Sequence, residues 1–398
     1  MTARATFRRP KVLCLGFDIE YLNPTPKMLV EAIRATSDAH FFGPGYQASE
    51  IIDRGLDNFL ERFGPFDIVL ADEFALQDFS PLARGEEMRF INHACRFDRR
   101  LLALGKEFQE FLSRCHEIRI IGLMQSDYYN FTERRIDQLK ALGDHFIAWG
   151  PELISSMAER GSGELPTSTI DADIVARWTD RYLEFAQACN EQVISCPHII
   201  SISEVGGPPL TERGTPWACL GADYRARVVA RDRLDRAGLV RSGQWMPKAF
   251  SIAGRLKFNP YNKYWSIALA QWGFRRALRQ ARFAFTCGSI LHWPIRKYFE
   301  IPANGGVLVC EKPKGFETLG FVDRVNSVVC DAEDILEADA WLSSDEVQAQ
   351  EIATAGQDLI IAKHTVEARG RQIGSAFQRI LDGTFRGSRW CKGEFQLL

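Results

Sequence analysis

The chain has 398 residues, which is too long for one ordinary hydrophobic core and suits two domains of about 150–200 residues each. Hydrophobic residues make up 46% and charged residues 25%, a globular balance that argues against extensive disorder. The net charge of −2 argues against nucleic acid as the partner of the whole chain. No apolar run approaches the roughly 20 residues of a membrane span. We therefore expect a cytoplasmic protein, with any membrane contact peripheral and on the inner face.

The ten cysteines are scattered, and none forms a Cys-x-x-Cys pair. Several lie inside apolar runs, where cysteine behaves as a small buried hydrophobe. This usage predicts reduced thiols and no zinc site.

The first half of the chain alternates apolar runs with helical stretches. Residues 11–17 (KVLCLGF), 66–71 (FDIVLA), 118–124 (IRIIGLM) and 145–149 (HFIAW) have the length and composition of buried strands. Residues 26–35 have helical spacing. Strands that alternate with helices predict a parallel sheet covered on both faces, hence an α/β fold.

Acidic residues follow several of these strands, at the edge where ligands of parallel sheets bind. Asp127 comes shortly after the third strand and is flanked by Tyr128 and Tyr129, whose rings can stack on a ligand. Asp18 directly follows the first strand. We therefore take Asp127 and then Asp18 as candidates for a catalytic base. The alternative for either is a cap of the next helix.

The second half repeats the strand–helix rhythm after a Gly/Pro-rich stretch at 206–216, the predicted interdomain linker. We expect an N-terminal domain at 1–207, a C-terminal domain at 208–380 and a tail at 381–398. A strand at 198–203 is predicted before the linker. The strands expected after it lie at 217–221, 283–286 and 306–310, and the helices at 224–237, 294–303, 344–362 and 365–381.

Charge is strongly segregated in this second half. No acidic residue occurs from 236 to 299, whereas twelve basic residues do, interleaved with aromatic residues. Segregated positive charge predicts an anionic partner, with a nucleotide diphosphate as the first candidate, an acidic membrane surface as the second and nucleic acid as the third. For the membrane, the predicted contact is 243–283. The alternative is that the arginines at 275–282 form an ordinary solvated helix face.

The segment from 282 onward reads as strand, small-residue turn, helix, glycine turn and strand. Gly288 and Ser289 in the turn allow close approach of a ligand to the backbone. Arg296 and Lys297 lie in the first helical turn. The positive end of the helix dipole disfavours cations there, so their presence indicates that an anion binds at the same site. Glu300, one turn later, can accept hydrogen bonds from both hydroxyls of a ribose. Gly221, Arg225 and Arg227, after the first strand of this half, complete the expected phosphate site; the alternative for the two arginines is an ordinary helix surface.

The same segment resembles the donor domain of the group-one glycosyltransferases, particularly their spore-maturation-type (CgeB-like) subgroup. The resemblance covers residues 217–380. Its residues are Pro294, Arg296, Phe299, Glu300, Ala303 and Gly305, followed by His364, Thr365, Glu367 and Arg369.

The resemblance implies a GT-B fold, in which two Rossmann-like domains face each other across a cleft and a C-terminal helix returns to the N-terminal domain. It also implies transfer of a sugar from a nucleotide-diphosphate donor to a carbohydrate or lipid-linked acceptor, as in polysaccharide biosynthesis. Neither a cofactor nor a metal is expected, because basic side chains and a helix N-terminus can stabilise the leaving diphosphate.

One residue departs from the family pattern. Many retaining members carry two glutamates in the pattern Glu-x7-Glu; Glu300 matches the second, and Trp293 occupies the first position. If the first glutamate contacts the sugar in the family, that contact is missing here or is replaced by His292. Two alternatives remain open: a non-catalytic glycan- or nucleotide-binding protein with a degenerate GT-B fold, and a polyol-phosphate transferase that uses a cytidine diphosphate donor.

Overall fold

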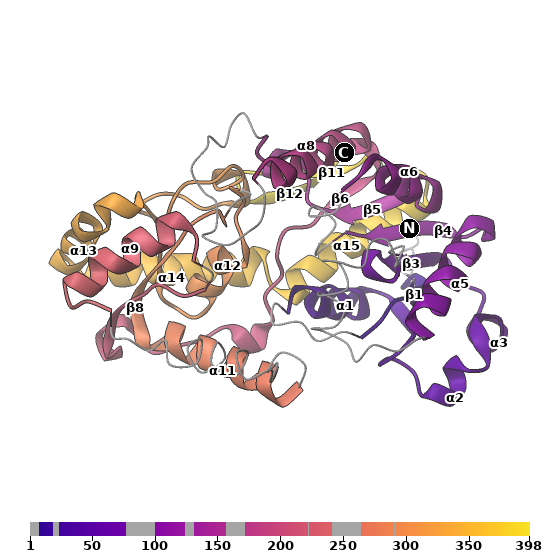
Figure 1. Ribbon diagram of the computed structural model, residues 1–398, viewed down its shortest axis with the longest axis horizontal. Helices are drawn as coiled ribbons and strands as arrows, with labels where there is room; N and C mark the ends of the chain where they lie inside the picture. Colours follow the sequence, from indigo (N-terminus) through magenta and orange to yellow (C-terminus); the bar gives the residue numbers. More distant parts are fainter. Residues whose placement is uncertain are drawn as a thin grey trace, which may run out of the picture.

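A computed structural model describes residues 8–18, 24–76, 100–123, 131–156, 172–221, 223–240, 264–289 and 292–398. The chain forms two α/β lobes that lie side by side in Figure 1, the N-terminal one in indigo and magenta and the C-terminal one mainly in orange. Each lobe has its own parallel sheet. The predicted α/β architecture of two Rossmann-like domains is therefore confirmed.

The N-terminal domain is built on a six-stranded parallel sheet in the order β2-β1-β3-β4-β5-β6. Its strands are β1 (Lys11–Leu15), β2 (Asp38–Phe42), β3 (Ile68–Asp72), β4 (Ile118–Gly122), β5 (His145–Ala148) and β6 (Val193–Ser195). Its helices are α1 (Thr25–Thr36), α2 (Ser49–Ile52), α3 (Gly55–Phe63), α5 (Arg100–Arg114), α6 (Glu133–Leu142) and α8 (Ala172–Ala188). Alternate residues of β1 pack into two different clusters, Leu13 on one face of the sheet and Val12 on the other. This two-sided burial explains why the strands are continuous apolar runs.

Four of these strands were predicted and two were not. The runs at 11–17, 66–71, 118–124 and 145–149 correspond to β1, β3, β4 and β5. Edge strand β2 begins with polar, partly exposed residues, so its apolar signal is short. Strand β6 has only three residues.

The C-terminal domain has a four-stranded parallel sheet in the order β10-β9-β8-β7. The strands are β7 (Thr215–Ala218), β8 (Ala281–Thr286), β9 (Val307–Cys310) and β10 (Val328–Val329). The helices are α9 (Arg225–Arg236), α11 (Tyr264–Gln280), α12 (Arg296–Ala303), α13 (Ile335–Ser344), α14 (Glu346–Lys363) and α15 (Val366–Leu381). The predicted strands and helices of this half occur in the expected order with ends shifted by a few residues, whereas α11, β10 and α13 were not predicted.

The segment before the linker differs from its prediction. Residues 198–203 were expected to form a strand, but only Ile200 forms a β-bridge, and it pairs with Thr365. A 3-10 helix, Ile202–Glu204, follows at once. Ser201 and Glu204 form a reciprocal capping box that begins this helix, which is why the extended run stops.

The last helix joins the two domains. In Figure 1, α15 runs from the C-terminal domain back to the N-terminal one, as expected. It packs on α1, and Gly370 permits the approach because a Cβ there would lie 3.2 Å from the Ala32 carbonyl oxygen. The hairpin β11 (Ser388–Cys391) and β12 (Glu394–Leu397) then extends along β6. Residues 366–397 therefore pack largely on the N-terminal domain.

The His-Thr-x-Glu-x-Arg element forms the joint between α14 and α15. Thr365 caps α15 by accepting a hydrogen bond from the Ala368 amide. The buried His364 ring bonds the Leu319 carbonyl oxygen at 3.1 Å and Arg369 Nη2 at 3.0 Å. This element fixes the direction in which α15 leaves the domain, so its role in this structure is architectural.

Candidate functional site

The expected donor-site residues lie at the carboxyl ends of β7 and β8, where helices α9 and α12 begin. Gly221 follows β7, and Arg225 is the exposed first residue of α9. Gly288 and Ser289 follow β8, with Ser289 in the left-handed region at φ 60°. Free N–H groups at the starts of both helices give this edge of the sheet a positive potential. The sheet edge therefore suits an anion.

Two cationic side chains meet beside Gly221. A Cβ on Gly221 would lie 2.6 Å from Nζ of Lys297 and 3.0 Å from Nη1 of Arg227, so only glycine leaves room for both. Its φ of +107° also favours glycine. Arg227 is fully buried and donates to Oγ1 of Thr286, at the end of β8, at 3.3 Å.

Lys297 has the chemical features of an anion ligand. Within the described residues, no carboxylate forms an ion pair or hydrogen bond with its Nζ, which lies 5.6 Å from the centroid of the Phe274 ring. Burial, and next the neighbouring charge of Arg227, lower the pKa of Lys297 to about 8. A bound anion would oppose both effects, because its negative charge stabilises the protonated ammonium group.

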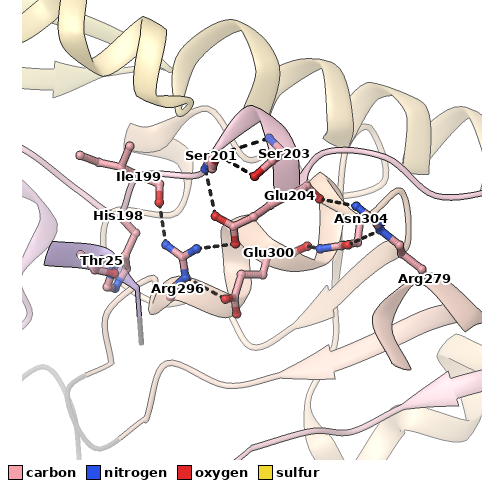
Figure 2. Close-up of polar contacts among 10 residues, drawn as sticks. All are labelled: Thr25, His198, Ile199, Ser201, Ser203, Glu204, Arg279, Arg296, Glu300 and Asn304. Atoms are coloured by element: carbon pink, nitrogen blue, oxygen red, sulfur yellow. Dashed lines mark hydrogen bonds and ion pairs between the residues drawn. The ribbon is translucent and has the colours of Figure 1, made fainter. Parts of the chain in front are cut away.

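Arg296 begins α12, and its side chain contacts other groups of the protein (Figure 2). Its guanidinium is only 5% exposed and donates from Nη2 to Oε2 of Glu204 at 2.6 Å and from Nε to Oε1 of Glu300 at 2.8 Å. Nη1 donates to the carbonyl oxygen of Ile199 at 2.6 Å. Burial opposes the charge, but the two carboxylates outweigh it and raise the pKa of Arg296. Arg296 thus ties α12 to the segment that precedes the linker, while the diphosphate contact expected from the sequence stays a prediction.

Glu300 is held in a defined position by this arrangement. Its Oε1 accepts the hydrogen bond from Arg296, one helical turn earlier. Asn304, four residues later, holds the backbone of the same turn, because its Nδ2 donates to the Glu300 carbonyl oxygen at 2.8 Å (Figure 2). Glu300 is partly exposed, and it is close enough to Lys297 to raise that residue's pKa. The carboxylate expected to bind ribose is therefore beside the cationic pair.

Trp293, at the position of the missing first glutamate, contacts the N-terminal domain. The side chain is 3% exposed and packs against Trp149 at 5.4 Å and Tyr182 at 5.9 Å between ring centroids. The adjacent His292 carbonyl oxygen accepts a hydrogen bond from Ser155 at 3.3 Å. This turn therefore belongs to the interface between the two domains, and a carboxylate in the same place would be buried among aromatic rings.

A second candidate region lies at the carboxyl ends of β1 and β3 in the N-terminal domain. Asp18, Tyr46 and Asp72 line one pocket there, together with Lys27 and Arg34. Burial, followed by the Asp72 and Asp18 charges, raises the pKa of Tyr46 well above its ordinary value, so the phenol stays a hydrogen-bond donor. This pocket has the polar groups needed to orient a hydroxylated ligand.

The sequence identified this region only in part. Asp18 was a predicted base and does lie at the pocket, where it is exposed. Asp127, the preferred base, lies outside the described residues. Tyr46 was missed, because it lies in the turn after β2, and the strand itself was not recognised.

Among the described ranges, no group of three or more His, Cys, Asp or Glu side chains is placed to hold a metal ion. No helix in the described part of the chain is long and apolar enough to cross a membrane.

Comparisons with known proteins agree with this geometry. Residues 230–375 match the family described as "Glycosyl transferase-like". A comparison with curated proteins gave no match. The fold is similar to that of HepE from Anabaena, solved in complex with UDP-glucose: the TM-score is 0.50 at 10% identity, over 93% of this chain and 99% of that one. It is also similar to sucrose-phosphate synthase from Thermosynechococcus elongatus, with a TM-score of 0.50 at 11% identity, over 94% of this chain and 100% of that one.

Proposed function

We propose that this chain, a glycosyltransferase with the GT-B fold, transfers a sugar from a nucleoside-diphosphate donor without using a metal ion. The observation that carries the proposal is the meeting of Arg227 and Lys297 beside Gly221, at the starts of two helices. Membership of the spore-maturation-type subgroup remains a proposal, and it rests on the motif from Pro294 to Gly305 and on the element from His364 to Arg369.

The diphosphate is the group that this cationic pair fits. When the bond between the anomeric carbon and the phosphate oxygen breaks, negative charge builds up on the departing diphosphate. Arg227 and Lys297 lie in a largely buried position, where their charges act more strongly than in water. Helix N–H groups and the bare backbone at Gly221 and Gly288 add donors that need no rearrangement. These groups would stabilise the leaving group in place of a divalent cation.

Glu300 would bind the ribose of the donor. An ionised carboxylate accepts hydrogen bonds from two adjacent hydroxyls, and charge-assisted bonds of this kind are the strong ones. Arg296 holds one oxygen of Glu300, and Glu204 in turn holds Arg296, so the carboxylate has little freedom to rotate away. Arg296 is therefore a positioning residue in this proposal.

The acceptor would bind on the N-terminal domain. The pocket formed by Asp18, Tyr46 and Asp72 offers two carboxylates and a phenol at the carboxyl ends of β1 and β3, the edge at which ligands of parallel sheets bind. Asp127 follows β4 in the sequence and remains the proposed base, with Asp18 as the alternative. A hydroxyl of an envelope glycan or a lipid-linked carbohydrate is the proposed acceptor.

One observation favours a non-catalytic binding protein as the second candidate. Trp293 occupies the position of the first glutamate of the Glu-x7-Glu pattern, and it is buried against Trp149. Without a carboxylate at this position the chain would still bind the nucleotide while losing transfer. Hydrolysis of a bound nucleotide sugar by the purified protein would exclude this candidate, whereas binding without turnover would support it.

A thermal-shift screen against nucleoside diphosphates tests the donor site. UDP is the first ligand to try because HepE was solved with UDP-glucose. A ligand at a hundred times its Kd stabilises the native state by about 2.7 kcal/mol. We expect one diphosphate to raise Tm, and Lys297→Met to weaken its binding at least about tenfold. Arg371→Met, an exposed change on α15, is the matched control and should leave binding unchanged. Equal binding by the Lys297 variant would contradict the assignment of the diphosphate site.

A further inference from the structure

Helix α11 exposes an apolar stripe to solvent. Trp265 is 62% exposed, Leu269 39% and Trp272 50%, and their spacing of four and then three residues places them on one face. Ala268 and Arg276 are exposed on the same face. The stripe from Trp265 to Trp272 spans two helical turns, or about 10 Å. Large apolar side chains gathered in this way mark an interaction surface, whereas isolated ones do not.

The opposite face of α11 is already occupied by the protein core. Ile267 and Leu278 are buried, and Leu278 joins a large hydrophobic cluster that extends through both domains. In Figure 1 the helix lies along the lower edge of this domain. The exposed side chains of the stripe are therefore not needed to anchor α11, because the buried face of the helix holds it on the domain.

The charge around the stripe is positive. Residues 264–280 include three arginines and no acidic residue. The Arg279 side chain points toward the protein, where it donates hydrogen bonds to Oδ1 of Asn304 and to the Glu204 carbonyl oxygen. Arg275 is partly exposed and Arg276 is exposed, with its guanidinium 5.6 Å from the centroid of the Trp272 ring. An exposed cation thus lies at one end of the apolar stripe.

We propose that this α11 face, defined by Trp265, Leu269, Trp272 and Arg276, docks on an anionic membrane surface. Indole rings partition to the boundary between headgroups and acyl chains, where the ring is in apolar surroundings and the N–H stays hydrated. Arginines beside them pair with lipid phosphates. The helix lies flat in the interface, as amphipathic basic helices with tryptophans do.

Other occupants fit the α11 face less well. A second copy of the chain would bring the same arginines together, which costs free energy. Nucleic acid is bound mainly through many phosphate contacts, whereas this face offers few free cations and an apolar stripe over two turns. The inference depends on this surface alone and does not require the sugar-transfer proposal.

Co-sedimentation with lipid vesicles tests the docking. We expect the full chain to bind vesicles of phosphatidylcholine with phosphatidylglycerol, and to bind phosphatidylcholine alone at least about tenfold more weakly. Added salt should weaken the binding, because exposed charges are screened beyond about 10 Å at 0.1 M ionic strength. The double variant Trp265→Gln/Trp272→Gln should lose at least about tenfold in binding, and Arg276→Glu should lose the preference for anionic lipid.

Matched controls separate docking from general effects. Val347→Ser removes an apolar side chain that is 71% exposed on α14, and Arg371→Glu reverses an exposed charge on α15; neither should change vesicle binding. All four variants should unfold in a cooperative thermal transition close to that of the wild type, which shows that they fold. Equal vesicle binding by the double tryptophan variant would overturn the proposal, as would a dimer in solution that the same variant dissociates.

Discussion

Raising the pH from 7 to 9.5 should weaken nucleoside-diphosphate binding, because Lys297 loses its proton in the free protein over this range. Burial and the nearby Arg227 hold the pKa of Lys297 at about 8 when the site is empty. A bound diphosphate supplies negative charge beside Nζ and should return the pKa to about 10.5, the ordinary value. Binding therefore takes up a proton above pH 8, and affinity falls as the pH rises.

The size of the effect follows from these two pKa values. With about 8 for the free protein and about 10.5 for the complex, the dissociation constant should rise roughly 30-fold between pH 7 and pH 9.5. At pH 8.5, about three quarters of a proton should be taken up for each ligand bound. The ligand does not confound the measurement, because the last phosphate ionisation lies near pH 6. Burial raises the pKa of the neighbouring Cys219 thiol to about 12, so it does not titrate here.

Isothermal titration calorimetry in buffers of different ionisation enthalpy measures both the affinity and the proton uptake. Lys297→Arg is the matched variant, because arginine stays charged throughout this range. It should bind the diphosphate with little dependence on pH, while Lys297→Met should bind weakly at every pH. The reasoning is refuted if the wild-type affinity is constant from pH 7 to pH 9.5, or if the arginine variant shows the same proton uptake.

Three further predictions concern the neighbouring residues. Glu300→Ala should weaken donor binding by about 1–3 kcal/mol, the usual value of hydrogen bonds to a charged group; calorimetry that finds unchanged affinity would count against the ribose contact. Glu204→Gln removes one of the two counter-charges of the buried Arg296 and should lower the free energy of unfolding by about 1–3 kcal/mol in urea titrations. A loss below about 0.5 kcal/mol, the range of ordinary surface changes, would mean that this ion pair contributes little. Asp127→Asn should reduce kcat by about a hundredfold or more while donor affinity is kept; near-normal turnover would transfer the role of base to Asp18 or to the donor phosphate.

Local sequence patterns were sufficient for most elements of the fold. Continuous apolar runs predicted β1, β3, β4 and β5, because strands buried on both faces need apolar residues at every position. The elements around the donor site were also predicted, since the turn at Gly288 and the helix with Lys297 and Glu300 are adjacent in the chain. Short or edge strands such as β2 and β6 were missed, because pairing with a neighbouring strand stabilises them more than their own composition does.

The partners of the site residues were decided by the tertiary structure. The sequence placed a cation at the start of α12 but could not specify its partner, which is Glu204, 92 residues earlier in the chain. It likewise showed Trp293 in place of a glutamate, while only the packed domains bring that ring against Trp149. Propensity and periodicity act over a few neighbouring residues, so the sequence determined where helices, strands and the donor motif lie. Ion pairs and ring contacts depend on distances in space between segments far apart in the chain, so they were fixed only when the two sheets, the linker and α15 packed together.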